Sequence, residues 1–133
     1  MQLYPYLSFD GRCAQAMAFY AEVFGGEPRM IRFGDSPAPV PPEAADRILH
    51  AELRTAGLVI QASDTVPGMP PVQGGQISMS LSLADEAEQD AVWAALSQDA
   101  EVLQPLSKQF WGRFGMLRDR YGVTWMLNLD QAH

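Results

Sequence analysis

Hydrophobic and polar residues follow each other along the first quarter of the chain in a pattern that predicts a strand and then a helix. Residues 3–9 are mostly apolar and aromatic and run into Asp10-Gly11, which predicts a strand that ends at a turn. Spacings of three and four then predict one buried helix face, made of Cys13, Ala16, Met17, Tyr20 and Phe24. Asp10 is placed to cap this helix, and Gly25-Gly26 to end it.

Three more strands are predicted before the middle of the chain. They cover residues 29–34, 48–54 and 58–62, and the last two are joined by a turn at residues 55–57. The segment GDSPAPVPPEAAD (34–46) contains four prolines and predicts an irregular loop. A second segment rich in proline and glycine, TVPGMPPVQGG (65–75), closes this half.

The second half repeats the order of the first. QISMSLSL (76–83) alternates polar and apolar residues, which predicts a strand with serines on one face. Asp85 followed by Glu88 predicts a capped helix start. The apolar face of that helix is predicted to be Ala87, Ala91, Val92, Ala95 and Leu96. Strands are predicted at residues 102–106, 112–118 and 123–129, with the turn DRYG between the last two.

The order of one strand, one helix and three strands therefore occurs twice. GLVIQASD (57–64) and GVTWMLNLD (122–130) both place glycine at a turn, then an apolar strand, then aspartate. Such duplication predicts two copies of one small unit. We expect a single α+β domain, residues 1–133, in which module 1–64 and module 75–129 share one sheet and enclose a cleft.

Composition and charge narrow the classes of partner. The chain has a formal charge of −7 and a pI near 4.6, which argues against nucleic acid or an anionic membrane surface as partner. One cysteine, Cys13, excludes an intrachain disulfide, and we expect its thiol to be buried rather than reactive. MQLYPYLSF lacks the basic region of a signal peptide, and no apolar run approaches the roughly 20 residues of a membrane span. A cytoplasmic protein is predicted.

Four segments carry a family resemblance, namely PYLSFDGRCAQAMAFYAEVFGGE (5–27), ILHAEL (48–53), LVIQASD (58–64) and WGRFGMLRDRYGVTWMLN (111–128). With the duplicated order, they make the chain resemble the vicinal oxygen chelate superfamily of glyoxalase I, bleomycin-resistance proteins and extradiol dioxygenases. The details resemble its PhnB-like branch. The resemblance implies two βαβββ modules in a curved mixed sheet with a cleft, and a homodimer.

Members of this branch often carry the label 3-demethylubiquinone-9 3-methyltransferase. A typical methyltransferase needs a Rossmann-like domain whose glycine-rich loop follows the first strand. The chain has no G-x-G-x-G at that place and is too short for such a domain. We therefore expect no methyl transfer.

The resemblance also implies where a metal would be held. Metal-using members place two ligands in each module, and the corresponding positions here are Pro5, Gln61, Ser78 (or Gln76, if the register shifts by two) and Met126. Proline and methionine cannot serve a hard or borderline divalent ion. We expect no metal and no cofactor at this site.

The same geometry implies a ligand-binding surface of apolar walls with a few polar anchors. Its expected residues are Phe9, Gln61, Ser78, Ser80, Met126 and Asn128. Such a lining suits a small, partly apolar molecule. The alternative is that these side chains, or the proline-rich loops, fill the cleft.

An enzyme is the second hypothesis. His50 and Glu52 lie two apart on a predicted strand and so share a face. They could act as acid and base in an isomerase or lyase, with Glu52 orienting or polarising His50. They could instead contribute to a rearranged metal site. The alternative without a function is that they simply form a polar strand face. Arg113 and Arg118 are candidates for binding an anionic group, or simply surface charges on a hairpin. A purely structural or partner-binding domain is the third hypothesis.

Overall fold

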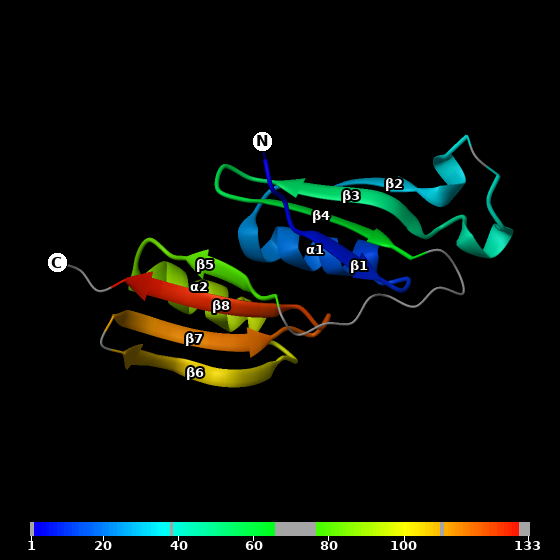
Figure 1. Cartoon of the computed structure of the whole chain (residues 1–133). Helices are drawn as coiled ribbons and strands as arrows, with labels where there is room; N and C mark the ends of the chain where they lie inside the picture. The colour runs from blue at the N-terminus through cyan, green and yellow to red at the C-terminus, as the bar shows by residue number, and fades with distance from the viewer. Residues whose placement is uncertain (1, 38, 66–76, 110, 131–133) are drawn as a thin grey trace. The chain divides into compact units, whose positions relative to one another are not determined.

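The structure is a computed structural model that describes residues 2–37, 39–65, 77–109 and 111–130. The chain divides into two compact units, Met1–Gln73 and Gly74–His133. In Figure 1 the first runs from blue to green and the second from green to red, and each has its own helix and sheet. The predicted proline-rich segment 65–75 lies outside the described residues, apart from Thr65.

Unit 1 holds a four-stranded mixed sheet. Its elements are β1 (Tyr6–Phe9), α1 (Cys13–Phe24), β2 (Arg29–Arg32), the short 3-10 helices η1 (Phe33–Asp35) and η2 (Pro42–Ala44), β3 (Ile48–Arg54) and β4 (Val59–Asp64). The strand order is β1-β4-β3-β2, with β1 parallel to β4 and the other pairs antiparallel.

Unit 2 repeats this arrangement. Its elements are β5 (Met79–Ser82), α2 (Glu86–Leu96), β6 (Glu101–Gln109), β7 (Gly112–Arg118) and β8 (Thr124–Asp130). The strand order β5-β8-β7-β6 matches that of unit 1, and β5 is again parallel to β8. The predicted α+β class with two βαβββ modules is confirmed, and the backbone hydrogen bonds give each module a four-stranded sheet of its own.

The predicted first helix is confirmed, but its cap is not the predicted one. The four residues Cys13, Ala16, Met17 and Tyr20 are fully buried, and Gly25 ends the helix with φ of +87°. At the other end, the carboxylate of Asp64 accepts hydrogen bonds from the backbone N–H of Gly11 (2.8 Å) and Cys13 (3.0 Å). The prediction that Asp10 caps the helix is wrong, because Asp10 instead pairs with Arg47 at 2.9 Å.

The second helix begins as predicted and packs differently. Asp85 Oδ1 accepts the backbone N–H of Glu88 at 2.8 Å, which confirms the predicted cap. Ala87 and Ala91 are exposed, however, whereas Gln89 is fully buried. The Gln89 amide donates to the carbonyls of Arg113 (2.9 Å) and Leu127 (3.2 Å), so β7 and β8 satisfy its polar atoms. Hydrogen bonds from Gln89 to the sheet therefore determine which face of α2 is buried. The spacing of apolar residues in the sequence cannot predict such hydrogen bonds.

The turn between β7 and β8 is built on Asp119. Its Oδ1 accepts the backbone N–H of Tyr121 (2.8 Å) and Val123 (3.0 Å), and its Oδ2 accepts the indole N–H of Trp125 (2.8 Å). Gly122 closes the turn with φ of +88°, a conformation that glycine adopts without strain. The predicted turn DRYG is confirmed.

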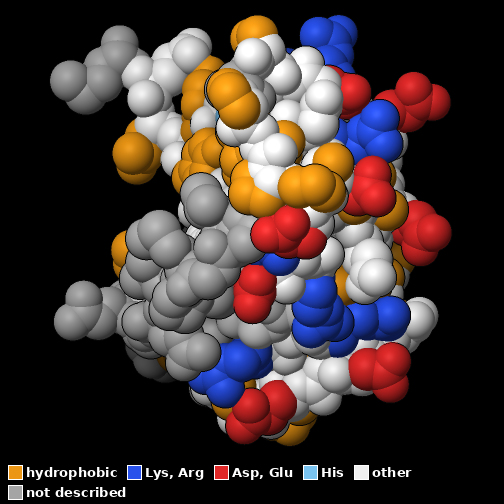
Figure 2. All heavy atoms as spheres, turned by 90° about the vertical axis from the view of Figure 1, so that its right-hand side faces the viewer, with side chains coloured by type: hydrophobic (Ala, Val, Ile, Leu, Met, Phe, Trp, Pro, Cys, Tyr) orange, Lys and Arg blue, Asp and Glu red, His pale blue; other side chains and the backbone are white. Residues whose placement is uncertain are grey.

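Two observations concern membranes and charged partners. Neither helix drawn in Figure 1 has the length and apolar character that crossing a bilayer requires. On the face drawn in Figure 2, basic side chains are intermixed with acidic ones and do not form a separate basic area. This mixture agrees with the net charge of −7.

Candidate functional site

Each sheet has a face that its own helix covers and an opposite face. In unit 1, α1 packs on β3 and β4, where Ala51, Leu53, Ile60 and Ala62 are buried. Side chains alternate between the two faces along a strand. The half-buried residues between these buried ones, at positions 50, 52 and 61, therefore point to the opposite face.

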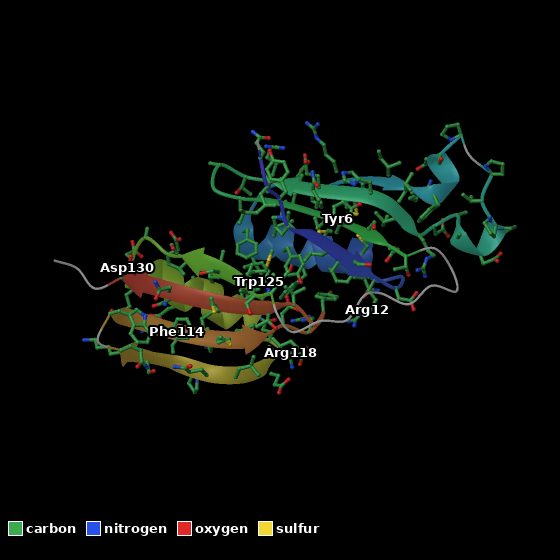
Figure 3. All side chains as sticks on the ribbon, in the orientation of Figure 1. Tyr6, Arg12, Phe114, Arg118, Trp125 and Asp130 are labelled. Carbon is green, nitrogen blue, oxygen red and sulfur yellow. The ribbon has the colours of Figure 1, made fainter. Side chains whose placement is uncertain are left out.

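That opposite surface of unit 1 is the polar face, defined here as Tyr6, His50, Glu52 and Gln61. Tyr6 and Glu52 are both paired with Gln61, from the strands on either side of β4. Paired residues on neighbouring strands point to the same face. Tyr6, labelled in Figure 3 on β1, places its hydroxyl oxygen 3.1 Å from His50 Nδ1.

His50 and Glu52 have different hydrogen-bond partners in the structure. The two share a face as expected, but Glu52 Oε1 accepts from the Gln61 amide (3.2 Å) and the Arg54 guanidinium (3.4 Å). These hydrogen bonds, Gln61 first and then Arg54, lower the pKa of Glu52. In the described residues the hydrogen-bond partner of His50 is Tyr6, and Glu52 makes no hydrogen bond to His50 there. An acid–base role of the two residues stays a prediction.

Phe9 does not share a surface with Gln61. β1 pairs with β4 so that Tyr6 stands beside Gln61 and Phe9 beside Asp64. Phe9 is 6% exposed and belongs to the core on the helix side of the sheet. The prediction placed Pro5 beside Gln61, one residue away from the observed pairing of Tyr6 with Gln61, and a shift of one residue exchanges the two faces of a strand.

The corresponding surface of unit 2 is the apolar face, defined here as Phe114, Met116, Met126 and Asn128. Met116 is paired with Met126 and Phe114 with Asn128, and all four are half-buried. The alternate residues of these strands are buried on the side of α2, as Gly115, Leu117, Trp125 and Leu127. A Cβ at Gly115 would lie 2.7 Å from a ring carbon of Trp93 on α2, which confirms that the helix covers that side.

Two residues at the edges extend the apolar face. Ser80 on β5 is paired with Met126 and is exposed. Trp111, 41% exposed, donates its indole N–H to Asn128 Oδ1 at 3.2 Å, and its ring lies edge-on to Phe114 at a centroid distance of 6.1 Å. Figure 3 labels Phe114 and Trp125 on the neighbouring strands β7 and β8.

The predicted residues Ser80, Met126 and Asn128 are thus brought together on one face. Ser78 is half-buried and precedes β5 without a strand partner, and Gln76 lies outside the described residues. Sequence reasoning missed Trp111, Phe114 and Met116 as members of this surface. Counting in twos along the hairpin partner of Met126 would have found Phe114 and Met116.

The donor atoms at the positions implied for a metal do not fit a divalent ion. Tyr6 replaces Pro5 as the residue beside Gln61, and Met126 is flanked by Ser80 and Met116. The side chains at these positions are a phenol, an amide, a hydroxyl and thioethers, whereas such ions prefer imidazole and carboxylate donors. On the polar face those donors are His50 and Glu52, which are two and not the three or more of a typical site. In the described parts of the chain, no three residues among His, Cys, Asp and Glu are grouped to hold a metal ion.

The two arginines considered for an anionic group are engaged in ion pairs. Arg113 reaches Asp90 at 2.8 Å and Glu86 at 3.5 Å, and Arg118 reaches Glu101 at 2.8 Å. The ion pairs of Arg113 tie β7 to α2, and the ion pair of Arg118 ties β7 to β6. The interpretation of these arginines as structural charges on the hairpin is the one that the contacts support.

We expect Cys13 to resist thiol reagents in the folded protein. Burial, with a smaller contribution from the charge of Asp64, raises the pKa of its thiol to about 12, and the side chain is fully buried. Ellman's reagent at about pH 8 should therefore react far more slowly with native protein than with protein unfolded in guanidinium. Equal rates in the two states would contradict the burial of Cys13.

Comparisons with known proteins cover nearly the whole chain. A family model described as 3-demethylubiquinone-9 3-methyltransferase matches residues 1–128. Protein YjdN of Escherichia coli K12 is 31% identical, with 97% of this chain and 95% of that protein covered.

Solved structures share the fold. Protein PA1353 from Pseudomonas aeruginosa has a TM-score of 0.89 at 38% identity and covers 99% of both chains. A PhnB protein from Bacillus cereus has a TM-score of 0.78 at 27% identity, covering 97% of this chain and 99% of that one. A glyoxalase/bleomycin resistance protein from Albidiferax ferrireducens T118 has a TM-score of 0.62 at 14% identity, covering 98% and 100%. At that low identity it shows a likeness of fold alone.

Proposed function

The chain belongs to the 3-demethylubiquinone-9 3-methyltransferase family, which is PhnB-like and has the glyoxalase/bleomycin-resistance fold, and from this premise we propose that it binds a small, partly apolar molecule without a metal. The methyltransferase name is a family label and does not establish an activity. Rossmann-like methyltransferases need a doubly wound parallel sheet. The described strands instead form two four-stranded sheets, each with a single parallel pair.

The apolar face of unit 2 is the observation that carries the proposal. Phe114, Met116 and Met126 present a ring and two thioethers that α2 does not cover, and Trp111 adds an exposed indole. Methionine side chains adapt to ligands of irregular shape. Asn128 and Ser80 supply hydrogen-bonding groups within the same surface, which suits a ligand with an apolar body and a few polar atoms.

Thermal-shift screening with a metabolite and antibiotic library tests this proposal. We expect some partly apolar compounds to stabilise the protein, and Met126→Ser to lose that stabilisation because it removes the central apolar side chain of the face. Leu49→Ser is the matched control, since Leu49 is 38% exposed and lies on β3 of the other unit. Stabilisation by no compound, or an equal loss in both variants, would contradict the proposed site.

Elemental analysis of the purified protein tests the metal-free part of the proposal. The side chains at the implied ligand positions, Gln61 and Met126, are poor ligands for such ions, and the described residues hold no group of three or more His, Cys, Asp or Glu, so we expect protein without bound Zn, Ni, Mn or Fe. A stoichiometric amount of any of these metals would contradict it.

We also propose that the protein is a cytoplasmic homodimer. The family resemblance supports this assembly, and the single cysteine, fully buried, is compatible with a reducing compartment. Size-exclusion chromatography with light scattering decides the oligomeric state, and a monomeric mass would contradict the dimer.

A further inference from the structure

We propose that the polar face of unit 1 binds the carboxylate of a small organic acid through His50, with Tyr6 as the positioning residue, and that binding takes up a proton. This inference concerns residues of unit 1 and is independent of the apolar face of unit 2. The ligand class is a weak carboxylic acid, recognised by its negative charge and hydrogen-bond acceptors.

The contact between Tyr6 and His50 leaves one imidazole nitrogen for a ligand. The hydroxyl of Tyr6 lies 3.1 Å from Nδ1, and the two ring centroids are 5.8 Å apart, so the ring of His50 is held in one orientation. Nε2 has no protein hydrogen-bond partner among the described residues. An imidazole has two distinct nitrogens, and a bond to one of them decides what the other presents. Nε2 is therefore the atom that can donate to a ligand.

The charges around His50 favour an anion once the ring is protonated. The charged groups on this face are Arg29 from β2 and Glu52 and Arg54 from β3, while β1 contributes the phenol of Tyr6 and β4 the neutral amide of Gln61. Glu52 is the single carboxylate of this set, and its Oε1 already accepts from Arg54 and Gln61. Arg54 and Arg29 together outweigh this one carboxylate, so the face is net positive, and protonation of His50 adds a further positive charge.

The number of hydrogen-bond donors on the imidazole explains why His50 takes up a proton when the carboxylate binds. In the protonated ring both nitrogens donate, so Nδ1–H donates to Tyr6 and Nε2–H forms a charge-assisted hydrogen bond with the carboxylate. The neutral ring carries one proton and no charge, and it binds an anion weakly. Because the bound complex holds one more proton than the free pair does, affinity falls about tenfold per pH unit once the free imidazole is neutral.

NMR titration of the protein with benzoate tests this inference, and benzamide serves as the uncharged probe of the same shape. The chain has two histidines, His50 and His133, so the His50 ring signals are assigned with His133→Gln. At about pH 5.5 we expect benzoate to shift the His50 Hε1 signal saturably and benzamide to leave it unchanged. At about pH 8 the benzoate affinity should be at least tenfold weaker.

Three variants complete the test. His50→Gln should abolish benzoate binding, while His133→Gln should retain it. Tyr6→Phe keeps the ring and removes the hydroxyl; we expect weaker benzoate binding at about pH 5.5 with unchanged thermal stability, which a packing role alone would not produce. An equal response to benzamide, a linear response without saturation, unchanged binding in His50→Gln, or affinity independent of pH would each overturn the proposal.

Discussion

Replacement of Asp64 by alanine is expected to lower the free energy of unfolding by about 3–5 kcal/mol, because three backbone N–H groups, two of them buried, lose their acceptor. Asp64 is 4% exposed, and its two oxygens accept from the N–H groups of Gly11, Cys13 and Ile48. The carboxylate thereby joins the end of β4 to the start of α1 and to β3. Arg12, the residue at the N-cap position of this helix, makes no side-chain hydrogen bond to the helix start.

Urea denaturation of matched variants measures this effect. Asp130→Ala is the control, because Asp130 ends β8 as Asp64 ends β4 but is exposed and bonded only to Asn128 among the described residues; we expect a loss within about 0.5 kcal/mol. Asp64→Asn keeps one acceptor oxygen and should fall between the two. Equal losses for Asp64→Ala and Asp130→Ala would show that the three hydrogen bonds contribute little.

The second large effect is expected for Trp125→Ala, with a loss of about 3–5 kcal/mol in the free energy of unfolding. Trp125 is 1% exposed and is the largest fully buried side chain of the described residues. Its removal leaves a cavity between β8 and α2 and deprives Asp119 Oδ2 of the indole N–H at 2.8 Å. Loss of the hydrogen bond to Asp119 weakens the turn that joins β7 and β8.

Two further tryptophan variants separate these contributions. Trp125→Phe keeps most of the packing and loses the hydrogen bond, so its loss should be smaller than that of Trp125→Ala. Trp111→Ala removes an exposed indole and should cost less than about 1 kcal/mol. If thermal unfolding ranked Trp111→Ala equal to Trp125→Ala, the division between core and surface tryptophans would be wrong.

The sequence determined the local elements of this protein. Alternation and turn residues predicted β3 and β7 with the bounds that the structure has, and spacings of three and four predicted α1. The turn of Asp119 to Gly122 was also predicted correctly. These features depend on contacts between residues close in the chain, and composition and spacing record such contacts directly.

The tertiary structure decided which residues meet. Asp64 caps a helix 51 residues earlier in the chain, and Tyr6 contacts His50 across 44 residues. Both contacts depend on the parallel pairing of β1 with β4, because that register places Tyr6 on the polar face and Phe9 in the core. A strand's own alternation fixes which residues share a face but leaves open its register against a distant partner, and one residue of shift exchanges the faces. The sequence therefore identified His50, Glu52 and Gln61 as candidate residues, whereas the place of Tyr6 beside them and the contacts within the polar face were decided by the sheet.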